Sequence, residues 1–184
     1  MPEALDNWPR YIDAAKRQCL IAEYHVRSLE EKLGTPDRGH DAPPIPVQAH
    51  FEGVIVSVMA VVDKVAQAAN SALVLSLNQG ELVSGAMAEL GRQLPGVKDW
   101  FEKPIGLDLR RIRVRIIHYF YVKALHPAGP QWQVESAGTG YTGSRELLSY
   151  SQAAVAYGTA LSALIPAIEA HLDERVASSR KVTP

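Results

Sequence analysis

Four arginines and one histidine lie close together between Leu109 and Tyr121, in a segment whose other side chains are mostly apolar. Arginine keeps its charge and is rarely buried without a partner, so an apolar segment rich in arginine needs a reason beyond packing. Arginine binds phosphate and carboxylate groups, and histidine gains or loses a proton near neutral pH. The segment therefore predicts a functional site.

A helix from Asp108, a suitable N-cap, to about Ala124 should carry this segment. On a helical wheel, Arg111, Arg115 and His118 share one polar stripe opposite the apolar face. Arg113 lies at the edge of the apolar face, where a bare charge is costly without a carboxylate or an anionic ligand. The predicted helix thus presents cations on two sides.

The run from Arg113 to His118, Arg-Val-Arg-Ile-Ile-His, resembles the Arg-x4-His signature of HEPN domains, a family of nucleotide-binding helical domains. The order of elements over residues 8–175 is similar to that of the family. Polar side chains within 51–70 also resemble a helix that precedes the signature in some members. These side chains are Glu52, Asp63, Gln67 and Asn70.

The resemblance implies metal-independent RNA cleavage in a homodimer cleft of a defence or toxin–antitoxin protein, without a cofactor. Arg113 would bind the phosphoryl group and His118 would transfer the proton. Active members usually carry Asn, Asp or His where this chain has Val114, so we expect weak cleavage or none, with RNA or partner binding retained. An antitoxin or another protein is an expected partner. Further RNA contacts are expected from Arg110, Arg111, Arg115 and Tyr121.

Two other functions remain open on the residues alone. Arg113 could form a structural ion pair with Asp63 or Glu52 in a non-catalytic bundle that acts through homodimerisation, while the other arginines form a solvated face. A metal-binding bundle is the third class, although no HExxH or ExxH spacing occurs and we expect no metal site. Its candidate ligands would come from His25, His50, His118, His126 and His171.

Composition argues for a cytoplasmic protein. The 19 basic and 20 acidic side chains nearly cancel, which disfavours nonspecific coating of nucleic acid or membrane. The single cysteine, Cys19, cannot form an intramolecular disulfide, and we expect a buried structural thiol. We predict no signal peptide and no membrane span, because the N-terminus lacks an apolar run and no long uninterrupted one follows.

Apolar periodicity predicts one all-α domain over 1–184, an up-down bundle of four long helices plus one or two short ones. The expected long helices are 8–33, 47–77, 108–124 and 144–174, with a shorter one over 80–94 capped by Asn78. Trp100 and Phe101 should lie in a short helical or irregular piece, and Pro166 should kink the last helix. Loops are expected at 34–46 and 126–143, the latter with one hairpin near Trp132, and a flexible tail at 176–184.

Overall fold

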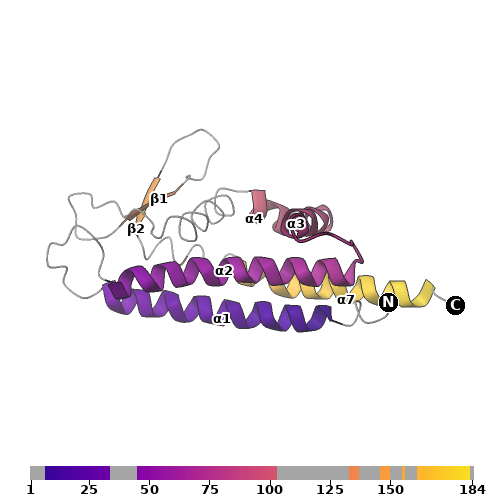
Figure 1. Cartoon of the computed structure of the whole chain (residues 1–184), viewed down its shortest axis with the longest axis horizontal. Coiled ribbons are helices and arrows are strands. Elements are labelled where there is room, and N and C mark those ends of the chain that lie inside the picture. Colours follow the sequence, from indigo (N-terminus) through magenta and orange to yellow (C-terminus); the bar gives the residue numbers. More distant parts are fainter. Residues whose placement is uncertain are drawn as a thin grey trace.

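A computed structural model describes residues 7–33, 45–102, 133–136, 146–149, 155 and 161–182 of the chain, with side chains placed outside the two four-residue strands and Val182. The described part is mostly helical. Two long helices, α1 (Trp8–Leu33) and α2 (Ile45–Ala72), lie side by side, with α7 (Ile165–Val182) packed along them (Figure 1). The predicted helix over 8–33 is confirmed.

Helix α1 packs through a single seam of buried side chains. Their spacing alternates between four and three residues, which is the repeat that keeps one face of a helix against a neighbouring helix. Small side chains at the middle of the seam let the backbones of α1 and α2 approach closely. The seam consists of Trp8, Ile12, Ala15, Cys19, Ala22, Val26 and Leu29.

Helix α2 is the central core helix because it carries two such seams side by side. One contains Phe51, Val54 and Val58, and the adjoining one contains Ile55 and Val62; all five are almost fully buried. With two apolar faces, α2 packs against α1 and also contacts α3 and α7. The predicted broad apolar face is therefore confirmed.

Among the described helices, α2 is the one that is long and apolar enough to cross a membrane by length and composition. The core helix of a soluble protein satisfies the same test. Half of the most apolar window of α2 is buried inside the protein, which is consistent with a core helix.

Helix α2 ends at Ala72, five residues before the predicted boundary at 77. The Asn70 side chain accepts a hydrogen bond from the Leu77 backbone N–H at 3.0 Å, and the Asn70 carbonyl accepts one from Leu75. These bonds turn the chain away from the helix axis. Asparagine side chains compete for backbone donors in this way, so apolar periodicity alone placed the helix end too late.

Helix α3 (Leu82–Gln93) begins two residues after the predicted start, and α4 (Pro95–Glu102) follows almost at once. The predicted N-cap at Asn78 is wrong, because Glu81 is the N-cap residue of α3. The Asn78 side-chain oxygen instead accepts hydrogen bonds from the N–H groups of Gly80 and Glu81, in the turn before the helix. Pro95 ends α3 as predicted and opens α4, where proline fits a first helical turn. Trp100 lies in α4, so the piece for which helical or irregular structure was expected is helical.

The predicted helix over 144–174 is wrong in its first part. Residues 146–149 form strand β2 (Glu146–Ser149), which pairs antiparallel with β1 (Gln133–Ser136), with Val134 opposite Leu148. Backbone pairing here overrides the apolar spacing that favoured a helix. Strand β1 begins beside Trp132, close to the predicted hairpin, but its partner lies beyond the predicted loop.

The last helix starts at Ile165, after a short 3-10 turn over Ser162–Leu164. Pro166 is therefore its second residue, where no helical hydrogen bond is lost, and the predicted kink is wrong. The helix continues to Val182, so residues 176–182 are helical rather than a flexible tail. Glu169 accepts a hydrogen bond from Lys16 of α1 at 2.7 Å, linking the two helices at their surface.

Candidate functional site: an amide-lined pocket and a histidine pair

All residues predicted for catalysis and RNA contact lie outside the described part of the chain. These are Arg113 and His118, with Arg110, Arg111, Arg115 and Tyr121. Their roles stay predictions. The described residues offer two other features with the chemistry of a binding site.

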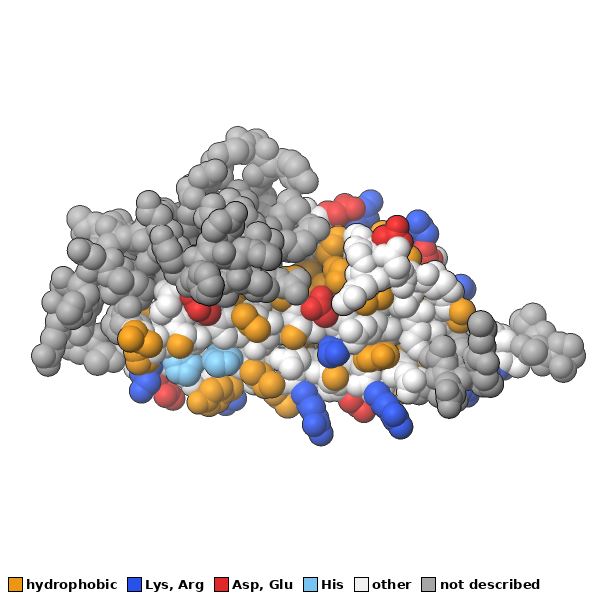
Figure 2. All heavy atoms as spheres, in the orientation of Figure 1, with side chains coloured by type: hydrophobic (Ala, Val, Ile, Leu, Met, Phe, Trp, Pro, Cys, Tyr) orange, Lys and Arg blue, Asp and Glu red, His pale blue; other side chains and the backbone are white. Residues whose placement is uncertain are grey.

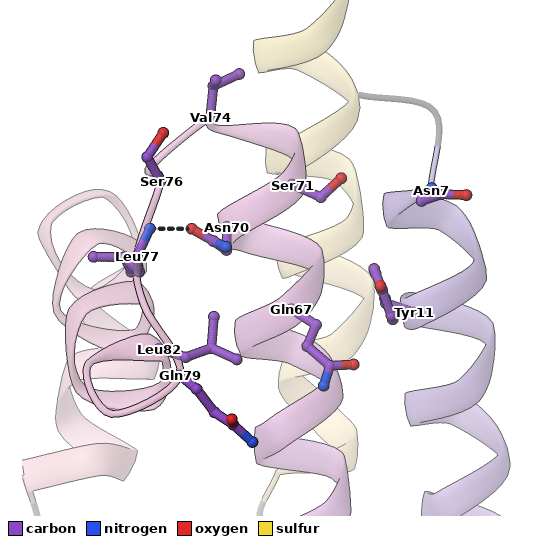
Figure 3. Close-up of a pocket in the computed structure, with 10 residues that line it drawn as sticks. All are labelled: Asn7, Tyr11, Gln67, Asn70, Ser71, Val74, Ser76, Leu77, Gln79 and Leu82. Atoms are coloured by element: carbon purple, nitrogen blue, oxygen red, sulfur yellow. Dashed lines mark hydrogen bonds between the residues drawn. The ribbon is translucent and has the colours of Figure 1, made fainter. Parts of the chain in front are cut away.

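The first feature is a pocket of about 520 Å³ between the N-terminal end of α1 and the C-terminal end of α2 (Figure 3). Four amide side chains and three hydroxyl groups line it. No charged side chain of the described residues does so, and Tyr11 is the one titratable group in the lining. The pocket therefore suits a neutral polar ligand better than acid–base chemistry. Its lining is Asn7, Tyr11, Gln67, Asn70, Ser71, Val74, Ser76, Leu77, Gln79 and Leu82.

Hydrogen bonds fix the orientation of two of these amides. The Gln67 oxygen accepts from the Lys64 ammonium at 3.0 Å, and the Asn70 oxygen accepts from the Leu77 N–H at 3.0 Å. Both partners can only donate, so the oxygens must face them. The Gln67 and Asn70 NH₂ groups remain as hydrogen-bond donors in the pocket lining. A ligand with carbonyl or ring-nitrogen acceptors would satisfy them.

An aromatic surface lies beside these donors. Tyr11 enters the pocket from α1, across from Gln67 of α2 (Figure 3). The Lys64 ammonium lies 5.8 Å from the centre of the Tyr11 ring, close enough for a cation–π contact. Lys64 thus orients the amide of Gln67 and contacts the ring of Tyr11. The pocket combines a planar apolar face with fixed donors.

The opposite wall of the pocket has an unusual backbone. Val74 and Ser76 have φ angles of 52° and 56°, in the left-handed region that non-glycine residues rarely adopt. For the β-branched Val74 this conformation is a genuine outlier. A strained backbone persists only where the surrounding structure holds it in place. Such strained residues are found most often at ligand-binding and active sites. The hydrogen bond from Leu77 to Asn70 supplies part of that restraint.

The polar residues of α2 do not act as one group. Gln67 and Asn70 lie together at the pocket, whereas Glu52 lies about four helical turns away and accepts a hydrogen bond from Gln48. Asp63 is half-buried one turn before Gln67. Arg113 lies outside the described part of the chain, so its alternative ion pair with Asp63 or Glu52 stays a prediction.

The second feature is a pair of histidines that joins α1 to α2. The Nδ1 atoms of His25 and His50 are 3.1 Å apart, and both rings are half-buried. Tyr24 meets them edge-on, with ring centres 5.5 Å from His25 and 6.2 Å from His50. A Cβ on Gly53 would lie 2.6 Å from the His25 ring, so glycine makes room for it. Figure 2 shows histidine side chains exposed where α1 and α2 meet.

Folding stability should depend on the protonation of His25. Desolvation and the neighbouring His50 lower the pKa of His25 below its ordinary value of 6.5. The unfolded chain therefore binds this proton more readily, so stability is complete above about pH 6.5 and falls as pH drops through the folded-state pKa. Urea unfolding of the wild type and of His25→Asn should show a smaller loss towards pH 5 in the variant. Equal losses would contradict this assignment.

The histidines proposed for a metal-binding bundle are only partly brought together. His171 lies on α7, separate from the pair, and its buried Nε2 has no hydrogen-bond partner among the described residues. Within the same residues, no three His, Cys, Asp or Glu side chains form a metal-binding group. His118 and His126 are outside the described part. Cys19 is buried, as predicted, and burial raises the pKa of its thiol.

The sequence pointed to some residues of both features but not to their arrangement as a pocket and a pair. The pocket depends on a turn with positive φ angles at Val74 and Ser76, which apolar periodicity does not signal. The two histidines are 25 residues apart in sequence, and they meet only because of the antiparallel register of α1 and α2. Gly53 was the available signal, because glycine in the middle of a long helix usually marks close packing.

Comparison of the chain with protein-family models, with characterised proteins and with solved structures finds no match.

Proposed function

We propose that the chain is a HEPN-like RNA-binding protein whose metal-independent ribonuclease activity is weak or lost. The observation that carries the proposal is the sequence Arg113-x4-His118, set in a segment with three further arginines. An arginine stabilises a phosphoryl group, and a histidine exchanges protons with a ribose hydroxyl or a leaving oxygen. Val114 replaces the polar residue usual at this position, which is why the proposal places binding before cleavage.

The finer architecture is part of the proposal. The segment 108–124 would form the fourth long helix of an up-down bundle with α1, α2 and α7. Two copies of the chain would pair through the face that carries His118, bringing two Arg-x4-His motifs into one cleft. Light scattering at micromolar concentration should then give the mass of a dimer.

The pocket on α2 supports RNA binding independently of the arginine segment. Sequence-specific RNA recognition usually targets unpaired bases, which stack on aromatic rings and receive hydrogen bonds on their edges. Tyr11 supplies a ring, and Gln67 and Asn70 supply donors whose direction is fixed. A neutral lining suits a base better than it suits a phosphate.

The test is RNA binding and cleavage by the full chain with single-stranded RNA, with and without EDTA. Arg113→Ala and His118→Ala should each abolish any cleavage, while Arg113→Ala should also weaken binding, because it removes a phosphate contact. Arg92→Ala is the matched control: it removes one exposed arginine that contacts Glu89 on α3. Cleavage that persists in His118→Ala would exclude the mechanism.

Two further variants separate the parts of the proposal. Val114→Asn restores the usual pattern, and a gain of cleavage would reveal an intact but disabled site. Gln67→Leu should weaken RNA binding through the pocket without changing cleavage of RNA that is already bound. RNA binding by neither the wild type nor Val114→Asn would favour the second candidate, a homodimeric bundle that binds an antitoxin or another protein. That candidate is favoured by the predicted position of Arg113 at the edge of an apolar helix face, where its charge would need a carboxylate partner.

A further inference from the structure

The Nδ1 atoms of His25 and His50 have the separation expected of two ligands of one metal ion. Zinc binds imidazole nitrogens at about 2.0 to 2.1 Å, so two nitrogens in a tetrahedral site lie about 3.3 Å apart. The observed separation is 3.1 Å. The two atoms that share a hydrogen bond thus already have nearly the separation of adjacent ligands, and each ring would turn so that both Nδ1 lone pairs meet at the ion.

The arrangement of the pair favours neutral imidazole rings, which is the form that binds a metal ion. Imidazole must be neutral to bind a metal, and two Nδ1 atoms that share a hydrogen bond at 3.1 Å require at least one neutral ring. Neutral rings can place their remaining hydrogen on Nε2 and leave both Nδ1 lone pairs free to bind. The Tyr24 ring lies edge-on to both histidine rings, and the absence of a side chain at Gly53 leaves room for the His25 ring.

We propose that His25 and His50 bind one divalent transition-metal ion through their Nδ1 atoms. Imidazole ligands suit zinc, copper and nickel, and affinity should follow the order in which copper binds most tightly. Among the described residues no third metal-ligating side chain joins the pair, so water or a ligand supplied by a partner completes the coordination. The ion would bridge α1 and α2, and it acts independently of the proposed RNA site.

Binding of this ion should stabilise the folded chain, because the pair exists only when α1 and α2 are packed together. Thermal unfolding of the tag-free full chain with added Zn²⁺ should show a rise in Tm that grows with Zn²⁺ concentration. His25→Asn and His50→Asn should each lower Zn²⁺ affinity on the order of tenfold or more, since a lost ligand costs at least as much as a lost supporting contact. His171→Asn removes a histidine outside the pair, and its Zn²⁺ affinity should equal that of the wild type.

Copper provides a second readout that does not depend on stability. One equivalent of Cu²⁺ should give an electron paramagnetic resonance spectrum with coupling to two imidazole nitrogens, reduced in each pair variant and unchanged in His171→Asn. Gly53→Ala keeps both histidines but displaces the His25 ring, so it should weaken binding as well.

Equal metal affinity in the wild type and the two pair variants would overturn the proposal. So would a wild type whose Tm does not respond to Zn²⁺. If the pair variants fail to fold, the copper spectrum of the wild type and its change in Gly53→Ala decide: no signal from two nitrogens means that the pair is joined by a hydrogen bond alone.

Discussion

Replacing Phe51 with alanine should lower the free energy of unfolding by about 3 to 5 kcal/mol, the usual cost of removing a buried aromatic side chain. Phe51 is fully buried near the start of α2, and it is among the largest fully buried side chains of the described core. The loss has two parts. The burial of the ring away from water no longer contributes to folding, and the packed helices do not close the cavity that the ring vacates. Chemical denaturation followed by circular dichroism measures the change.

Val56→Ala is the matched control for Phe51→Ala, because Val56 lies on the same helix with its side chain 49% exposed. Truncating an exposed side chain should change stability by no more than about 0.5 kcal/mol. If Phe51→Ala were as mild as the control, the face of α2 that carries Phe51 would not be part of the core.

Leu172→Ala should destabilise the chain by about 2 to 5 kcal/mol, which would establish α7 as part of the cooperative core. Leu172 is fully buried, and Ile168 one turn earlier is buried as well. The surface contact between Lys16 and Glu169 cannot supply this stability, since exposed ion pairs contribute little. Apolar burial must therefore hold α7 against α1 and α2.

Glu174→Ala, two residues further along α7 and exposed, controls for the helix propensity of the substituted residue. It should leave the midpoint of unfolding nearly unchanged. A mild Leu172→Ala, together with a separate early transition in the wild type, would mean that α7 unfolds independently of α1 and α2.

Long periodic helices could be predicted from the sequence, but their ends only where proline or glycine marks them. The bounds of α1 were predicted correctly because a proline near Trp8 and a Gly-Thr-Pro run after Leu33 mark both limits. The end of α2 was placed too late because a hydrogen bond from the Leu77 backbone N–H to the Asn70 side chain accompanies the end of the helix. Apolar spacing does not predict such a bond. The start of the last helix was placed too early for a similar reason, since strand pairing decided 146–149.

The site could be predicted only as residue types. Gln67 and Asn70 were singled out together, and the structure places both at one pocket. Tyr11 could not be added, because its neighbourhood depends on how α1 packs against α2. His25 and His50 were named among five histidines, but only the antiparallel register of the two helices selects this pair.

The distances along the chain between contacting residues imply an order of folding. His50 meets a partner 25 residues away, whereas Lys16 meets one 153 residues away. Closing the shorter loop costs less chain entropy, so the hairpin of α1 and α2 should form in the transition state and α7 should dock afterwards. Substitutions in α7 should then speed unfolding without slowing folding, and a chain emerging from the ribosome should build the hairpin before α7 has been synthesised.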